Sequence, residues 1–308
     1  MICKRALLLV ALLTSACGNY SNEDLEFMNA VPAQDDLVAS LPPAPLTTAN
    51  EAELSAQTHK AVRDFNGLID GVLAYVETVR SYEPTSRGHN SRTWGPAPAT
   101  DEDTGLPNGW RWRFVMTRSD VNETRFDYRM ELQPNGAGDD AWTAFIAGYF
   151  DAAVGVRRGK GYFLVNFAEL RTQGYPFRAN DNLTSVAVAY SNAAFPTSVS
   201  MMFAGVDGTT VELAYGAQAD GSGALAFTMT GNLIDQTPAI ETLDVTARWL
   251  PSGAGRADQV VRSGDGAGLH RVECWNDAFI EVYSDKPWLA PDRRTTGDPS
   301  LCPAIAGL

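Results

Sequence analysis

The chain has 308 residues, a formal net charge of −13, 44% hydrophobic residues and 27 glycines. This length and composition fit one globular domain rich in turns. The acidic excess disfavours binding to nucleic acid, or to anionic lipid headgroups through a basic patch, because neutralising phosphates requires clustered Lys and Arg. We interpret the acidity as a source of solubility and self-repulsion at a crowded surface.

Residues 1–16 have the layout of a secretory signal peptide. Lys4 and Arg5 form its positive end, an apolar run covers residues 6–13, and small residues precede the cleavage point. The apolar run is far too short to span a bilayer. These residues are therefore expected to be absent from the mature protein.

The stretch Leu13-Thr14-Ser15-Ala16-Cys17 resembles the lipobox of bacterial lipoproteins. The resemblance implies a diacylglycerol on the Cys17 sulfur, removal of the preceding peptide and acylation of the new amino terminus, which together make a stable membrane anchor. Thr14 stands where the family usually has leucine. The family's inner-membrane retention signal, an aspartate after the cysteine, is absent from Gly18-Asn19, which implies the outer membrane. The alternative is a secretory signal without lipid.

Removing the signal changes both the cysteine count and the charge. Cys3 leaves with the signal and Cys17 carries the lipid, so Cys274 and Cys302 remain. Two cysteines in an oxidising compartment most simply form one disulfide, which contributes about 3 kcal/mol in the chain-entropy model. The alternative, two thiolate ligands of a metal, lacks a nearby histidine or second cysteine pair. Lys+Arg falls from 24 to 22 against 37 Asp+Glu, so the mature formal charge is −15.

Residues 17–49 are predicted to form a flexible tether. They are acidic and rich in proline, as in Leu41-Pro42-Pro43-Ala44-Pro45, and show no sustained periodicity. A flexible chain of this length has an end-to-end distance on the order of 30 Å, which holds a domain clear of the lipid headgroups. A short amphipathic piece around Leu25, Phe27 and Met28 is a candidate contact with the membrane or the domain.

One strong helix is predicted at the start of a single domain, residues 50–308. Asn50 and Glu53 fit a capping box, and the helix is expected to end near Tyr82. Its apolar stripe follows helical spacing through Leu54, Ala61, Val62, Phe65, Ile69, Val72, Val76 and Val79. A stripe of this width needs a broad apolar partner surface.

Residues 83–109 are rich in Pro and Gly and predict a long loop. The cluster Asp101-Glu102-Asp103-Thr104-Gly105 resembles aspartate-rich calcium loops, yet the alternation of oxygen ligands and the closing glutamate are missing. We interpret it as a solvated acidic loop and expect no metal.

From Trp110 onward the hydrophobic period changes to two, which indicates half-buried strands. Short turns separate these segments and permit only antiparallel neighbours, so we predict a meander of about ten to twelve strands. The expected fold class is mainly β (α+β), with a curved sheet or open barrel packed on the helix. The expected strands cover 110–117, 125–132, 142–150, 161–170, 184–191, 197–204, 209–216, 223–231, 241–250, 256–263, 268–275 and 278–284.

Motifs for catalysis are absent from the sequence: there is no nucleophile elbow, phosphate-binding glycine loop or zinc-protease motif. We interpret His59, His89 and the pair Asp139-Asp140 as surface groups. His270 and Glu273 are three residues apart in a strand and should point to opposite faces. We predict a protein that is not an enzyme and has no cofactor. The Pro-rich tail should be pinned to the sheet by the disulfide.

The order of elements, a long helix followed by an antiparallel meander, resembles periplasmic lipoprotein carriers and receptors of the LolA/LolB type. The resemblance implies a curved sheet that holds acyl chains under a helical lid. The implied partners are the membrane, through the N-terminal lipid, and a lipid or other hydrophobic ligand. The alternative is a surface-displayed structural or interaction module that contacts an envelope protein. Candidate ligand contacts are Trp110, Trp112, Phe114, Phe126, Tyr128, Met201, Phe203, Phe227, Met229 and Trp249.

Overall fold

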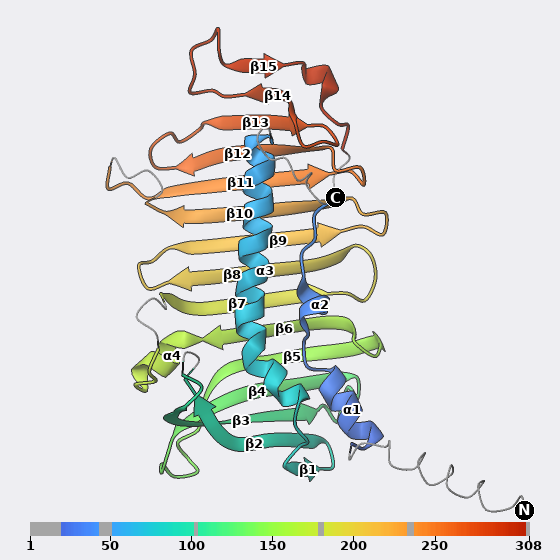
Figure 1. Ribbon diagram of the computed structural model, residues 1–308, viewed down its shortest axis with the longest axis vertical. Coiled ribbons are helices and arrows are strands. Elements are labelled where there is room, and N and C mark those ends of the chain that lie inside the picture. Colours follow the sequence, from blue (N-terminus) through green and yellow to red (C-terminus); the bar gives the residue numbers. More distant parts are fainter. Residues whose placement is uncertain (1–19, 43–50, 102–103, 178–181, 233–236, 306–308) are drawn as a thin grey trace, which may run out of the picture.

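The computed structural model describes residues 20–42, 51–101, 104–177, 182–232 and 237–305. These residues form one open antiparallel sheet in which each strand pairs with its neighbours along the chain, and a long helix crosses one face (Figure 1). The mainly β fold class and the meander are thereby confirmed. Cys17 and Asn50 lie outside the described residues.

All twelve expected strands are present, and three more join them. The additional strands are β1, β2 and β15. The strands are β1 Ser86–Gly88, β2 Ser91–Thr100, β3 Pro107–Arg118, β4 Arg125–Pro134, β5 Thr143–Gly155, β6 Arg158–Asn166, β7 Leu183–Ser191, β8 Thr197–Gly205, β9 Thr210–Ala217, β10 Gly223–Gly231, β11 Glu241–Trp249, β12 Gly255–Ser263, β13 His270–Trp275, β14 Glu281–Asp285 and β15 Thr295–Gly297.

The predicted long helix is α3, Glu53–Arg80. Its apolar stripe, including Phe65, Ile69 and Val76, is buried in one core with the inward side chains of the sheet. In Figure 1 the helix runs across the strands, from the level of β13 to the level of β4. Within the described ranges, no helix combines the length and the apolar character that crossing a bilayer requires.

The N-terminus of α3 is held by charged groups of β13. Leu54 N–H donates to Glu273 Oε1 at 2.6 Å, and Arg271 Nη2 donates to Glu273 Oε2 at 2.7 Å and to Glu53 Oε2 at 2.6 Å. Burial raises the pKa of Glu273, although the hydrogen bonds from Leu54 and Arg271 act to lower it. A carboxylate at this position also suits the positive end of the helix dipole. The start of the helix is therefore defined by a contact distant in sequence.

The prediction of a flexible tether is wrong for residues 20–42, which we call the N-terminal strap. The strap contains α1, Asn22–Asn29, and α2, Gln34–Leu37, and buries Phe27 and Leu37 completely against the sheet. The candidate amphipathic piece therefore contacts the domain. Helices this short carry too few turns to show a periodicity, and tertiary contacts hold them in place.

The strap runs beside α3 over the same face of the sheet (Figure 1). Asp36 pairs with Arg157 at 3.0 Å after β5, and Tyr215 of β9 donates its hydroxyl to Ser40 O at 2.9 Å. Because its contacts extend from β1 and β2 to β9, the strap covers core that α3 leaves open.

The predicted loop at residues 83–109 contains β1, β2 and the start of β3. Pairing with β1 reaches only as far as Thr93, so Pro96 and Pro98 lie where β2 has no neighbour on that side. An unpaired edge and a bulge between Trp94 and Ala97 accommodate residues that cannot donate a hydrogen bond.

A further difference concerns the strand expected at residues 161–170. It ends at Asn166, where helix α4, Phe167–Thr172, begins. The Asn166 side chain accepts from Glu169 N–H at 3.1 Å and so caps the helix.

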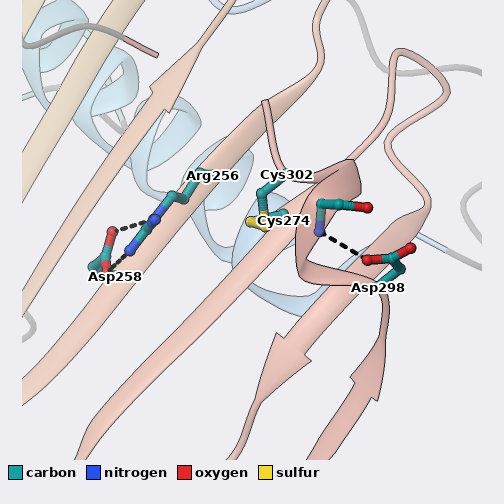
Figure 2. Close-up of a disulfide and its surroundings, with 6 residues drawn as sticks. Arg256, Asp258, Cys274, Asp298 and Cys302 are labelled. Atoms are coloured by element: carbon teal, nitrogen blue, oxygen red, sulfur yellow. Dashed lines mark hydrogen bonds and ion pairs between the residues drawn. A yellow bond between two sulfur atoms is a disulfide. The ribbon is translucent and has the colours of Figure 1, made fainter. Parts of the chain in front are cut away.

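The predicted disulfide joins Cys274 of β13 to Cys302, with the two Cα atoms 5.3 Å apart. Figure 2 shows Cys302 directly after the short 3-10 helix η2, Pro299–Leu301, where Asp298 accepts from Ser300 N–H. Glu273 and Trp275 face α3, so Cys274 points to the other face of the sheet. The tail is pinned as expected, and part of it supplies the edge strand β15.

Candidate functional site

A cleft of about 780 Å³ lies where the C-terminal end of α3 meets strands β2 to β5. Its lining combines aromatic, proline and small side chains from α3, from strands β2 to β5 and from the segments beside them. The lining residues are Ala74, Tyr75, Tyr82, Glu83, Thr85, Gly95, Pro96, Ala97, Pro98, Ala99, Thr100, Gly105, Pro107, Trp112, Met130, Leu132, Phe145 and Tyr175.

The floor of the cleft is formed by buried side chains of three neighbouring strands. Trp112 of β3 lies opposite Leu132 of β4, and Phe145 comes from β5. The period of two places them on the face turned toward α3. Together they provide a continuous apolar surface.

Two tyrosines form the walls. Tyr75 of α3 meets Phe145 edge to face, with ring centroids 5.5 Å apart. Tyr175, in the segment after α4, meets Trp110 in the same way at 5.3 Å, and Asn108 Nδ2 donates to its hydroxyl at 3.2 Å. The contacts with Asn108 and Trp110 hold the Tyr175 ring in place.

The bulged part of β2 borders the cleft. Gly95 has a φ of +86°, and a Cβ at this position would lie 2.7 Å from the backbone oxygen of Trp112. Only glycine tolerates both the positive φ and this approach. The bulge then places Pro96 and Pro98 along the cleft.

Two polar groups that line the cleft, the Glu83 carboxylate and the Thr85 hydroxyl, are paired within the protein. Glu83 lies 3.8 Å from Arg87, and the Thr85 hydroxyl donates to the carbonyl oxygens of Thr93 and Gly95. Among the described residues, no group of three or more His, Cys, Asp or Glu side chains is arranged to hold a metal ion. The cleft therefore suits an apolar ligand that is bound by shape complementarity and by burial of its apolar surface.

The ten residues predicted to contact a ligand all lie on strands of the sheet. Trp112 lines the cleft, and Trp110 supports Tyr175 beside it. Phe203 and Phe227 pack against the core, and Met229 is half-buried. The remaining five are buried in the core: Phe114, Phe126, Tyr128, Met201 and Trp249.

Three residues of the cleft are not among the predicted ligand contacts: Tyr75, Phe145 and Tyr175. They belong to a helix, a strand and a connecting segment, and only the tertiary fold brings them together. The signal in the sequence is the aromatic character of Tyr175 and Phe177, which lie shortly after the short helix α4.

The histidines are distributed as expected with one exception. His270 Nε2 lies 3.0 Å from Asp258 Oδ1 on the face away from α3, whereas Glu273 is buried against the helix. The prediction of opposite faces is confirmed. His59 is not a surface group, because it packs on Phe279 with ring centroids 5.0 Å apart and lies 2.8 Å from Glu51.

Comparison with protein-family models, with curated proteins and with solved structures finds no match to this chain.

Proposed function

We propose that this chain is a lipid-anchored protein of the bacterial outer membrane whose β-domain binds a lipid or another hydrophobic ligand without catalysing a reaction. The observation that carries the binding role is the cleft of about 780 Å³ with its floor of Trp112, Leu132 and Phe145. Ligand pockets in proteins are typically concave, mostly apolar and about 300–1,000 Å³ in volume.

The membrane anchor is supported by the sequence. The apolar run and Cys17 match the order of a lipoprotein signal, and the disulfide between Cys274 and Cys302 fits an oxidising compartment. Lipidation of Cys17 would keep the domain at a membrane, because several acyl chains together make release very slow.

Cys17→Ala is expected to move the protein from the membrane fraction to the soluble fraction, because it removes the sulfur that accepts the diacylglycerol. Fractionation with immunodetection measures this, and the mass of the N-terminal peptide reports acylation. Cys3→Ala is the matched control, since residue 3 leaves with the signal peptide, and it should stay on the membrane. Membrane retention of Cys17→Ala would contradict the anchor.

Ala74→Trp is expected to reduce lipid that co-purifies with the protein several-fold, because an indole on the exposed side of α3 fills the mouth of the cleft. Organic extracts of protein purified without detergent, analysed by mass spectrometry, give the lipid per protein. Ala144→Trp places the same side chain on β5, next to Phe145 but on the opposite face, and should leave lipid content unchanged.

Absence of lipid from the wild-type extract, together with no binding of a fluorescent fatty acid, would contradict the ligand-binding role. It would favour the alternative of a structural or interaction module, and the anchor would be unaffected.

A further inference from the structure

The ends of the strands and their connections form two opposite edges of the sheet. We propose that one of these two edges rests on the membrane that holds the anchor. It contacts the lipid through an apolar rim formed by Val121, Val154, Val156 and Phe195. This proposal rests on the proposed lipidation of Cys17. The edge is the one where the β1–β2, β3–β4, β5–β6 and β7–β8 connections lie, since alternate connections of a meander share an edge.

The distance between the anchor and the folded domain is short. Ser21 already belongs to the fold, because its side chain accepts from Asp24 N–H at 3.0 Å and caps α1. Only three residues lie between Cys17 and Ser21, and the four steps from one Cα atom to the other span at most about 14 Å in a fully extended chain. The tether expected from the sequence would have allowed more than twice that distance.

The strap enters the fold at this edge. Asp24 pairs with Arg92, whose Nη1 donates to Gly88 O beside the β1–β2 turn. Glu26 pairs with Arg118 at the end of β3. An acyl chain on Cys17 therefore brings these connections, and not the opposite edge, next to the bilayer.

The rim residues are unusually exposed for apolar side chains. Val121 in the β3–β4 connection is 98% exposed, and Phe195 in the β7–β8 connection is 60% exposed. Val154, near the end of β5, is 54% exposed, and Val156, in the β5–β6 turn, is 69% exposed. In a lipid interface these side chains would lose contact with water.

Hydrogen bonds join the β3–β4, β5–β6 and β7–β8 connections into one surface. Thr124 Oγ1 donates to Asp151 Oδ1 at 2.6 Å and links the β3–β4 connection to β5. Asn192 N–H donates to Gly159 O at 3.0 Å, and Asn192 Nδ2 donates to Arg157 O at 2.9 Å. The rim is thus presented by a fixed set of turns.

Charge at the rim is mixed. Exposed Arg158 and Lys160 follow the valines of the β5–β6 turn, whereas Asp120 and Glu123 flank Val121. The predicted mature charge of −15 also opposes attraction to anionic lipid. We therefore assign the contact to the apolar side chains, and it should persist at high salt.

The opposite edge holds the cleft and gives a control position. The β2–β3 connection with Gly105 and the segment with Tyr175 line the cleft there, whereas none of the four rim residues lines it. Val206, in the β8–β9 turn on that edge, is 56% exposed and is followed by Asp207.

Spin labelling of the full-length lipidated protein tests the orientation. Acylated Cys17 and the bonded pair Cys274 and Cys302 leave no free thiol in the mature wild type, so a single introduced cysteine takes the label. Val156→Cys and Phe195→Cys report on the rim, and Val206→Cys is the matched control. The protein is reconstituted into vesicles of phosphatidylethanolamine and phosphatidylglycerol, and collisions of the label with oxygen and with a water-soluble nickel complex are measured.

On reconstitution, both rim labels should lose collisions with the nickel complex and gain collisions with oxygen, whereas the control label should keep the values it has in detergent. If the wild type takes no label but the rim and control positions respond alike, the orientation is wrong and the anchor stands. If the wild type is itself labelled at Cys17, the anchor fails, and the orientation that depends on it fails as well.

Discussion

Asp24→Ala is expected to lower the free energy of unfolding by about 3–5 kcal/mol, because removing one partner of a buried ion pair leaves the other charge uncompensated. The Asp24 side chain is completely buried and lies 2.5 Å from Arg92 Nε and 3.0 Å from Arg87 Nε. Urea unfolding followed by circular dichroism measures the loss. Limited proteolysis should show earlier cleavage within the strap, since Asp24 connects α1 to β1 and β2.

Glu23→Ala is the matched control. Glu23 contacts the same guanidinium, with 2.5 Å between its Oε2 and Arg92 Nη2, but its side chain is 42% exposed. Exposed ion pairs contribute about 1 kcal/mol or less, so this variant should unfold close to the wild type. Equal losses for the two variants would show that burial of Asp24 does not determine the stability of the strap.

The same contact has a defined pH dependence. Burial alone would raise the pKa of Asp24, but hydrogen bonds from Arg92, Ser21 and Arg87 outweigh it and hold the pKa well below its usual range. A depressed native pKa stabilises the fold above the unfolded pKa, near about 4, and the contribution is lost as the pH falls through the native value. The stability difference between the wild type and Asp24→Asn should therefore be largest near neutral pH and should narrow in acid.

Cys302→Ser is expected to lower the free energy of unfolding by about 3 kcal/mol, because the unfolded chain regains the freedom of a loop closed by the disulfide. The bonded residues are 28 positions apart, and the loop contains β14, β15 and η2. Hydrogen exchange should show the loss first in these elements, since β14 and β15 contain only five and three residues.

Reduction provides the control for this variant. Dithiothreitol should lower the unfolding free energy of the wild type to that of Cys302→Ser and should leave the variant unchanged. A reduced wild type that unfolds at the same urea concentration as the oxidised protein would contradict a stabilising role for the bond.

Long periodic segments made most of the fold predictable. Helix α3 and strands β3 to β14 each carry enough apolar positions to show their period. The strap and β1, β2 and β15 do not. Pro96 and Pro98 argued against a strand, because the bulge at Gly95 that accommodates them depends on the neighbouring strand β3.

The candidate site was predictable only in part for a related reason. Alternation identifies which side chains of a strand share a face, and it selected Trp112 correctly as a member of that face. It also selected Phe114 and Tyr128, because core and cleft residues have the same pattern. The difference is made by the end of α3 and by the position of Tyr175, which leave space above Trp112 and none above Phe114.

The length of α3 is related to the number of strands that the helix crosses. Glu53 is paired with Arg271 on β13, and Tyr75 contacts Phe145 on β5. The helix therefore spans all the strands between β13 and β5. Adding one hairpin would lengthen the sheet by about 9.6 Å, which corresponds to roughly six residues of helix at 1.5 Å each. Chains of this architecture that differ in strand number should therefore differ in helix length by steps of that size, so that both ends of the helix keep their contacts with the sheet.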